Sequence, residues 1–196
     1  AVIILAAGRG TRMGSEFPKV LQPLAGRPMI GHVLESVTNL KPTLTVVVIA
    51  SGMDSVRSAV APYPVAIQKN QRGTADAVRA ARESLAAFTK GTVLILYGDT
   101  PLIQSNTLKR MIEAREMGAT VVLSGFHPSD PSGYGRFIHN EEYELVGIVE
   151  DADLEESQRG INFCPSGIMA VDARHLMPLV DVISDNNAKN EFYLTD

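Results

Sequence analysis

The chain has 196 residues, 45% of them hydrophobic, which is enough to bury one sizeable core in a single domain spanning residues 1–196. Eighteen basic against 22 acidic residues give a net charge of −4, so no overall positive field draws the chain to nucleic acid or to a membrane. One cysteine, Cys164, excludes an internal disulfide and a thiolate metal site, and with no apolar stretch of 18 residues and no signal peptide we expect a cytoplasmic protein.

The chain opens with an unbroken apolar run, residues 1–7, which is typical of a strand buried on both faces of a parallel sheet. Gly8 and Gly10 follow, and glycines at the end of a strand let backbone N–H groups approach phosphate oxygens. Arg12 and Lys19 add positive charge that neutralises an anion. The segment therefore predicts a polyphosphate-binding loop.

Two common glycine loops are excluded by spacing. A P-loop needs a second glycine five residues after Gly8, followed by Lys-Ser or Lys-Thr, and that place is taken by Met13. A dinucleotide-binding fingerprint also needs a glycine where Met13 stands. It further needs an acidic residue at the tip of the second strand, and that strand ends with Ile49-Ala-Ser-Gly52, which contains none. An ordinary strand-to-helix turn is the remaining alternative.

Strands and helices alternate along the first two thirds of the chain. Apolar runs predict strands over residues 43–50, 65–68, 91–97 and 120–126. Helical spacing predicts helices over residues 28–40, 53–60, 74–88 and 105–116, the last two capped by Thr74 and Ser105. This alternation predicts right-handed βαβ units in a Rossmann-like, doubly wound α/β sheet.

The pattern changes after residue 130. Short strands over residues 134–139 and 145–150 predict an antiparallel hairpin, and a strand over 167–171 is followed by a helix that Asp172 caps and that runs to Val182. We therefore expect a nucleotide-binding half, residues 1–128, and a second half, residues 129–196, with a small β-rich lid that closes over a second substrate.

Polar residues follow the strand that ends at Gln68. In open α/β sheets ligands lie outside the carboxyl ends of the strands. The amides of Gln68 and Gln71 can pair with the edge of a base, and Gly73 permits close stacking or backbone approach. Thr74 begins a helix, whose N-terminus favours anions. A solvated loop is the alternative.

A single carboxylate, Asp99, follows the strand that ends at Tyr97, within the segment Tyr97-Gly-Asp-Thr-Pro101. Mg²⁺ accepts one or two carboxylates and completes its shell with water and substrate phosphate. The position therefore predicts a magnesium ligand, with a helix-capping aspartate as the alternative. In the second half, the glycines of Gly133-Tyr-Gly-Arg136 would admit a sugar ring and Glu150 would accept from its hydroxyls; a hairpin turn and a solvated glutamate are the alternatives.

Seven segments together carry a resemblance. In this order they closely resemble the sugar-1-phosphate nucleotidyltransferases, and in particular the N-acetylglucosamine-1-phosphate uridylyltransferases, which form the N-terminal domain of a bifunctional bacterial enzyme supplying cell-wall (peptidoglycan) precursors. The match covers essentially the whole chain. The segments are Leu5-Ala-Ala-Gly-x-Gly-Thr-Arg-Met13, Pro18-Lys-Val-Leu21, Gln71-Arg-Gly-Thr74, Tyr97-Gly-Asp-Thr-Pro-Leu102, Gly133-Tyr-Gly-Arg136, Ile148-Val-Glu150 and Asn186-Asn-Ala-Lys-Asn-Glu-Phe-Tyr-Leu-Thr-Asp196.

The resemblance implies the nucleotide-diphospho-sugar transferase fold and the formation of UDP-N-acetylglucosamine and pyrophosphate from UTP and N-acetylglucosamine-1-phosphate, by Mg²⁺-assisted in-line attack. It gives the transferring phosphates to Arg12 and Lys19, and the Mg²⁺ to Asp99. It gives the amino sugar to Gly135, Glu150 and Tyr193. The nucleotide and the remaining substrate contacts would involve Leu5, Ala6, Ala7, Gly8, Gly10, Gln68, Gln71, Gly73, Thr74, Tyr97 and Gly98.

Two departures from the family pattern stand out. Pro165 occupies the place of an asparagine that contacts the sugar, and proline has no side-chain donor. A further asparagine ligand to the metal, the acetyltransferase β-helix and its trimer contacts all lie beyond Asp196 in the family, so we expect this chain to be a fragment. The alternatives are another sugar-1-phosphate or alcohol-phosphate nucleotidyltransferase, or a nucleotide-sugar-binding fragment with little turnover.

Overall fold

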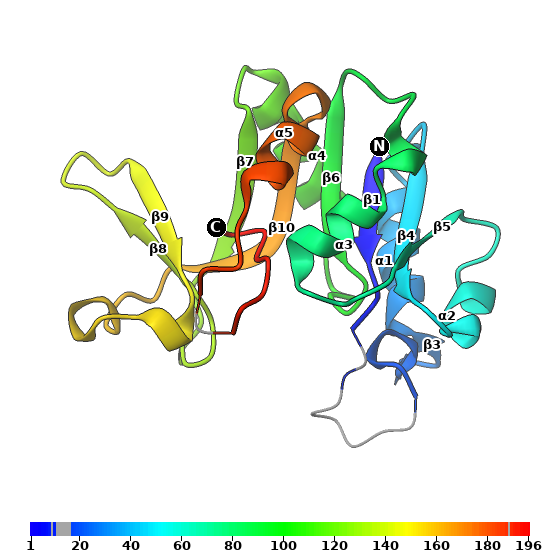
Figure 1. Cartoon of the computed structure of the whole chain (residues 1–196), viewed down its shortest axis with the longest axis horizontal. Coiled ribbons are helices and arrows are strands. Elements are labelled where there is room, and N and C mark those ends of the chain that lie inside the picture. Colours follow the sequence, from blue (N-terminus) through cyan, green and yellow to red (C-terminus); the bar gives the residue numbers. More distant parts are fainter. Residues whose placement is uncertain (9, 11–16, 188) are drawn as a thin grey trace.

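The computed structural model of the chain describes residues 1–8, 10, 17–187 and 189–196. At its centre is a six-stranded sheet in the order β5-β4-β1-β6-β10-β7 (Figure 1). The strands β1, β4, β5 and β6 are parallel, whereas β10 runs antiparallel to both of its neighbours. The predicted Rossmann-like, doubly wound α/β sheet is therefore confirmed, and β10 makes it a mixed sheet. Its strands are β1 (Val2–Leu5), β4 (Thr45–Ala50), β5 (Val65–Gln68), β6 (Thr92–Tyr97), β7 (Val121–Phe126) and β10 (Cys164–Asp172).

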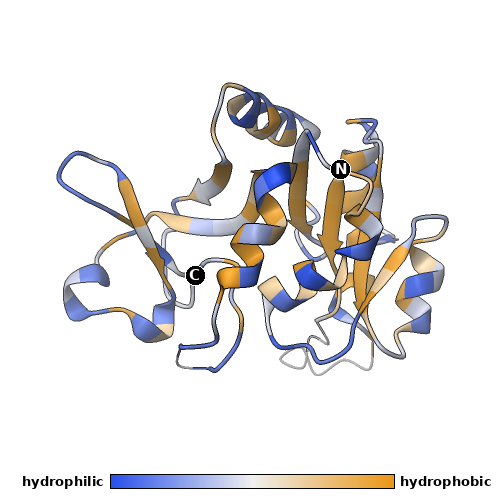
Figure 2. Cartoon of the chain, turned by 45° about the horizontal axis from the view of Figure 1, so that its top comes forward, coloured by the Kyte–Doolittle hydropathy of each residue, from blue (hydrophilic) through white to orange (hydrophobic). Residues whose placement is uncertain are grey.

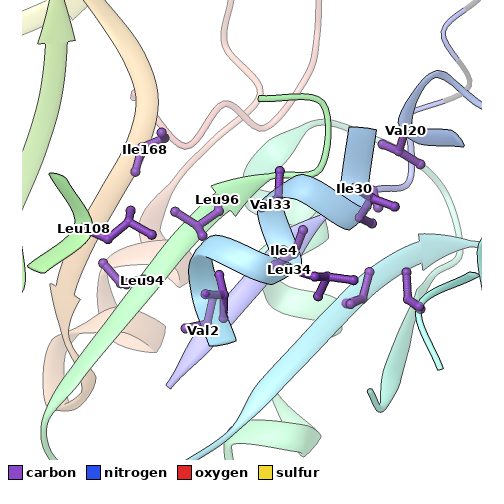
Figure 3. Packing of buried hydrophobic residues seen from close by; sticks show 14 of the residues in the cluster. Val2, Ile4, Val20, Ile30, Val33, Leu34, Leu94, Leu96, Leu108 and Ile168 are labelled. Atoms are coloured by element: carbon purple, nitrogen blue, oxygen red, sulfur yellow. The ribbon is translucent and has the colours of Figure 1, made fainter. Parts of the chain in front are cut away.

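Helices cover both faces of the sheet because the strand side chains are apolar on both sides. In β1, Val2 and Ile4 face one layer, and Ile3 and Leu5 face the other. Figure 3 shows the first layer, in which Val33 of α1 packs beside Ile4. The first layer holds α1 (Met29–Thr38), α2 (Asp54–Ala59) and α4 (Ser105–Glu116), and the second holds α3 (Thr74–Ala80) and α5 (Ala173–Val182).

The segment between β7 and β10, residues 127–163, leaves the sheet, and we call it the lid after its predicted role. It contains β8 (Arg136–His139) and β9 (Leu145–Val149), which pair antiparallel and form a separate ribbon to the left of the sheet in Figure 1. Figure 2 shows that the sheet strands are mostly apolar, while the tip of this hairpin is polar. The predicted hairpin is confirmed. Short 3₁₀ turns (η2, Lys19–Leu21; η3, Glu83–Leu85; η4, Asp151–Asp153; η5, Glu156–Gln158) and a small ribbon (β2, Pro23–Leu24; β3, Arg27–Pro28) complete the elements. Within the described part of the chain, no helix has the length and apolar character needed to cross a membrane.

Two predicted helix caps are wrong. Gly73 precedes α3, and the Thr74 hydroxyl accepts a hydrogen bond from the Leu194 amide at 2.8 Å instead of capping the helix. Gln104 precedes α4, and the Ser105 hydroxyl donates to the Ser36 carbonyl at 2.8 Å. In both cases a partner far along the chain competes successfully with the local cap.

Two predicted boundaries also differ. The helix predicted over residues 74–88 ends at Ala80, and a 3₁₀ turn, η3, follows it. The strand predicted over residues 167–171 already begins at Cys164, because a bulge between Pro165 and Met169 allows the earlier residues to pair with β7.

The cap of α5 is as predicted. The Asp172 carboxylate accepts from the backbone N–H of Arg174 at 3.0 Å and also pairs with the guanidinium groups of Arg174, at 2.7 Å, and Arg115, at 3.3 Å. The hydrogen bonds from Arg174, aided by the charge of Arg115, hold the pKa of Asp172 well below its usual range. The ionised carboxylate is therefore the form that the fold stabilises.

We expect Asp172→Ala to lower the urea midpoint of unfolding at pH 7, because it removes both the cap and the ion pairs. A depressed pKa stabilises the fold above the unfolded-state value of about 3.9, and this contribution disappears as the pH falls further through the folded-state value. The difference from the wild type should therefore shrink below about pH 4. Asp172→Asn retains a capping oxygen, so its midpoint should lie between those of the wild type and Asp172→Ala. Asp181→Ala breaks an exposed pair with Arg82, so its midpoint should change little. Equal midpoints for wild type and Asp172→Ala at pH 7 would contradict this account.

Candidate active site

A cavity of about 290 Å³ lies at the carboxyl ends of β1, β5 and β6. These ends meet at one edge of the sheet, so residues predicted from three separate segments come together there. The predicted residues around the cavity are Leu5, Ala6, Ala7, Gly8, Gly10, Lys19, Gln68, Gln71, Gly73, Thr74, Tyr97 and Asp99. Val20, Ala77 and Glu191, which the sequence analysis missed, also line it.

The loop after β5 is held in shape by its own amide side chains. Gln68 is only 4% exposed, and its Nε2 donates to the Gly73 carbonyl at 3.0 Å and to the Asp76 carboxylate at 2.9 Å. The Gln71 Nε2 donates to the Ala7 carbonyl, which ties this loop to the loop after β1. The two sides of the cavity are therefore braced against each other before any ligand enters.

Gly73 lies where another part of the chain crosses. Its φ is +111°, and a Cβ at this position would lie 2.4 Å from the Phe192 carbonyl oxygen. The Phe192 N–H donates to the Arg72 carbonyl at 2.8 Å, and the Ala75 N–H donates to the Phe192 carbonyl at 2.9 Å. The close backbone approach expected at Gly73 is thus an approach by the chain itself.

Gly73→Ala should both destabilise the fold and weaken nucleotide binding. Alanine in this left-handed region costs about 1–3 kcal/mol, and the clash with Phe192 adds about 1–3 kcal/mol more. Gly118→Ala is a matched control, because Gly118 has a φ of +117° and no atom within 4 Å of the added Cβ. Urea unfolding and calorimetry with UTP measure both effects. If Gly73→Ala is no worse than Gly118→Ala, the crossing segment is not firmly docked.

An ion pair lies in the cavity. The Lys19 Nζ is 2.7 Å from the Asp99 Oδ2, and the two side chains are 41% and 27% exposed. Asp99 follows β6 in a turn that the Thr100 hydroxyl closes by donating to the Tyr97 carbonyl at 2.8 Å. Gly10, with a φ of +66°, leaves room for Lys19, because a Cβ there would lie 2.7 Å from the Lys19 Cβ. A cation and a carboxylate are thus held side by side where phosphates would enter.

The cavity offers a metal one carboxylate rather than a complete site. Among the described residues, no three His, Cys, Asp or Glu side chains gather in a metal-binding group. This suits Mg²⁺, which commonly takes one or two protein carboxylates and fills its octahedron with water and substrate phosphate oxygens. The donor set at Asp99 therefore fits a cation that arrives with the nucleotide. Arg12, the other predicted phosphate ligand, lies outside the described residues.

A second cavity, of about 340 Å³, adjoins the first and shares Thr74, Tyr97 and Asp99 with it. The structure brings the predicted sugar residues Gly135, Glu150 and Tyr193 together around it. The sequence analysis missed Ser166, Gly167 and Thr195, which also line this cavity. The two cavities meet at Asp99 and Tyr97.

Close packing accounts for two glycines, Gly167 and Gly98, and places Pro165 in the wall of the second cavity. A Cβ on Gly167, whose φ is +81°, would lie 2.5 Å from the Tyr97 ring, so the ring lies directly over the glycine. The Pro165 ring forms part of the second cavity wall and lies 3.4 Å from where a Gly135 Cβ would stand. Gly98 packs closely, because a Cβ there would lie 3.0 Å from the Val20 side chain. It lines neither cavity, and its contact with the substrate stays a prediction.

Two tyrosines of the site, Tyr97 and Tyr193, have a raised pKa and are neutral at physiological pH. Burial raises the pKa of Tyr97 to about 12, although a hydrogen bond with Thr74 opposes the shift. Burial, followed by the carboxylates of Glu191 and Glu150, raises the pKa of Tyr193 to about 12. The two phenols can therefore donate hydrogen bonds, and neither is a general base.

Residues 2–149 match the family model of the MobA-like NTP transferase domain. The chain is 54% identical to the bifunctional protein GlmU of Rhodospirillum rubrum and 48% identical to that of Paramagnetospirillum magneticum. Each match covers 100% of this chain and 44% of the relative, so the chain spans less than half the length of these relatives.

Two solved structures share the fold. A UDP-glucose pyrophosphorylase complexed with UDP-glucose superposes with a TM-score of 0.77 at 17% identity, covering 100% of this chain and 83% of that one. A putative glucose-1-phosphate thymidylyltransferase from Bacillus anthracis, in complex with sucrose, superposes with a TM-score of 0.75 at 18% identity. The superposition covers 92% of this chain and 74% of that one. The expected nucleotide-sugar transferase fold is confirmed. Since the family model matches well over half of its residues, the chain belongs to the MobA-like NTP transferase domain family.

Proposed function

We propose that this chain is a UTP-dependent sugar-1-phosphate nucleotidyltransferase that forms UDP-N-acetylglucosamine and pyrophosphate from UTP and N-acetylglucosamine-1-phosphate. The observation that carries the proposal is the meeting of two cavities at Asp99, one lined by glycine-rich loops and Lys19, the other by Gly135, Glu150 and Tyr193. Two substrates bound there would have their reacting phosphates at the shared wall. The resemblance of the motifs to the uridylyltransferases supports the choice of uridine and amino sugar.

The reaction needs no nucleophile from the protein, because one substrate attacks the other directly. An oxygen of the sugar phosphate attacks the α-phosphorus of UTP, the bond between that phosphorus and the bridging oxygen breaks, and pyrophosphate leaves with the electron pair. Such transfers depend on positioning and on neutralising charge. Lys19 would neutralise the phosphates from one side of the shared wall. The loop containing Gln71 and Gly73 would orient the uridine.

Mg²⁺ is the cofactor that we propose, held by Asp99. When bound, it neutralises negative charge on the phosphates. Lys19, 2.7 Å from the same carboxylate in the structure, would then turn to the phosphates. Glu150 and Gly135 would hold the sugar hydroxyls in the second cavity, with Tyr193 donating from its neutral phenol. Trimer formation through a further domain and a cytoplasmic location stay predictions.

Pyrophosphate release tests the proposal. UTP should be turned over faster than CTP, dTTP or ATP, and N-acetylglucosamine-1-phosphate should be preferred to glucose-1-phosphate in the presence of Mg²⁺. A preference for a different sugar phosphate or an alcohol phosphate would assign the chain to another nucleotidyltransferase, and the Pro165 wall is the first place to look for the cause. Binding of UDP-N-acetylglucosamine with no pyrophosphate release from any pair would show a binding fragment.

A further inference from the structure

The C-terminal segment, residues 190–196, runs past both cavities, and we call it the strap. It forms no regular strand, and it turns at Leu194 and Thr195, where the Asp196 N–H donates to the Tyr193 carbonyl at 3.3 Å. Glu191 lines the first cavity, whereas Tyr193 and Thr195 line the second. Phe192 and Leu194 point the other way and pack against the apolar core. The strap therefore presents one face to the ligand cavities and buries the other.

The strap is anchored to the loop that precedes α3. Besides the two backbone hydrogen bonds of Phe192 described above, its ring lies beneath two guanidinium groups, 5.0 Å from the Arg72 Cζ and 4.6 Å from the Arg79 Cζ. The Leu194 N–H donates to the Thr74 hydroxyl. The strap is thus fixed to the part of the chain that is proposed to hold the nucleotide.

From this anchored strap, Thr195 reaches the lid. Its hydroxyl donates to the Glu150 Oε1 at 2.9 Å, across 45 residues of chain. In the described part of the chain, no salt bridge involves Glu150, so the hydrogen bond from Thr195 is the contact that orients its carboxylate from the strap. Glu150 follows β9, at the end of the lid hairpin, so this bond ties the lid to the strap.

We propose that Thr195 is a positioning residue, which orients the Glu150 carboxylate toward the second substrate and holds it in register with the nucleotide loop through the strap. This inference rests on the proposed function, in which Glu150 binds the sugar. A hydrogen bond to Oε1 leaves Oε2 to accept from a sugar hydroxyl. Because the bond is made to a charged group, it is among the stronger hydrogen bonds of the site.

The test removes the hydroxyl and then restores it. Thr195→Val, which keeps the shape, should raise the KM for N-acetylglucosamine-1-phosphate by about tenfold, the scale of one hydrogen bond to a charged group. The KM for UTP and the kcat should change little. Thr195→Ser, which keeps the hydroxyl, should restore the wild-type KM. Thr89→Val is a matched control, because Thr89 is exposed and lines neither cavity.

Binding to the enzyme without turnover gives a second readout. UDP fills only the nucleotide cavity, whereas UDP-N-acetylglucosamine fills both, so the ratio of their dissociation constants measured by calorimetry reports the sugar contacts alone. Thr195→Val should bind UDP as tightly as the wild type does. Its affinity for UDP-N-acetylglucosamine should be about tenfold lower than that of the wild type.

Three outcomes would overturn the positioning role. One is an unchanged ratio in Thr195→Val. Another is an equal loss of UDP and UDP-N-acetylglucosamine affinity that Thr195→Ser does not reverse, which would indicate a merely structural role. The third is a wild-type chain that binds both ligands equally. If the chain releases no pyrophosphate but the binding ratio still falls in Thr195→Val, the proposed turnover fails and the positioning role stands.

Discussion

Asp99→Asn is expected to abolish Mg²⁺-dependent pyrophosphate release and to leave the chain folded. Asparagine keeps the size of the side chain and removes the charge that would hold the cation. Misplaced phosphates at a transferring centre cost about a hundredfold or more in rate. The fold should tolerate the change, because the pair with Lys19 is partly exposed and such pairs contribute at most about 1 kcal/mol to stability.

A Mg²⁺ titration of the initial rate, with urea unfolding alongside, checks this expectation. Asp185→Asn is the matched control, because Asp185 is exposed and lines neither cavity. It should respond to Mg²⁺ as the wild type does. If Asp99→Asn keeps the wild-type rate and the wild-type dependence on Mg²⁺, Asp99 is not the ligand.

Lys19→Met should lower kcat/KM by about 10²–10³-fold, the scale of one lost electrostatic contact in a preorganised site. Methionine retains most of the side-chain length, so the loss reports the charge. The structure adds a second expectation, because the Lys19 Nζ pairs with the Asp99 carboxylate at 2.7 Å. Lys19→Met removes this pair, so Mn²⁺ should bind more tightly to the nucleotide-free variant than to the wild type.

Steady-state kinetics and the Mn²⁺ electron spin resonance signal measure the two expectations separately. Lys109→Met is the control, because Lys109 lies on the exposed side of α4. A near-normal kcat/KM for Lys19→Met would place the side chain outside the phosphate path. A loss on the same scale is expected for Arg12→Ala, where Arg12→Lys should not restore activity, because a point charge cannot replace a bidentate fork.

The sheet was predictable because its strands are continuous apolar runs, and their burial on both faces follows from that. The caps of α3 and α4 were not, because Thr74 and Ser105 bond to Leu194 and Ser36, which lie 120 and 69 residues away. Local sequence contains no sign of such partners. The early start of β10 was hidden by Pro165, which suggests a break in pairing, although the bulge after it accommodates the proline.

The candidate site was predictable where it follows strand ends, since topology gathers these ends at one edge. What the sequence did not reveal are contacts between segments. The pairing of Lys19 with Asp99 and that of Thr195 with Glu150 depend on how distant parts fold together. Arg136, which stands in a motif assigned to the sugar site, is 2% exposed, and its guanidinium donates to the Tyr134 carbonyl instead of lining a cavity.

Because β10 runs antiparallel to β7, the segment between these two strands can be replaced without altering the sheet. Phe126, the last residue of β7, is paired with Cys164, the first residue of β10. The intervening 37 residues, 127–163, therefore leave the sheet and return to it at adjacent points. An insertion with neighbouring ends can be lengthened, shortened or grafted from a relative without disturbing strand register. An exchange of this insertion would therefore alter the proposed sugar contacts at Gly135 and Glu150, while Tyr193 and Thr195, which line the same cavity from outside the insertion, would stay in place.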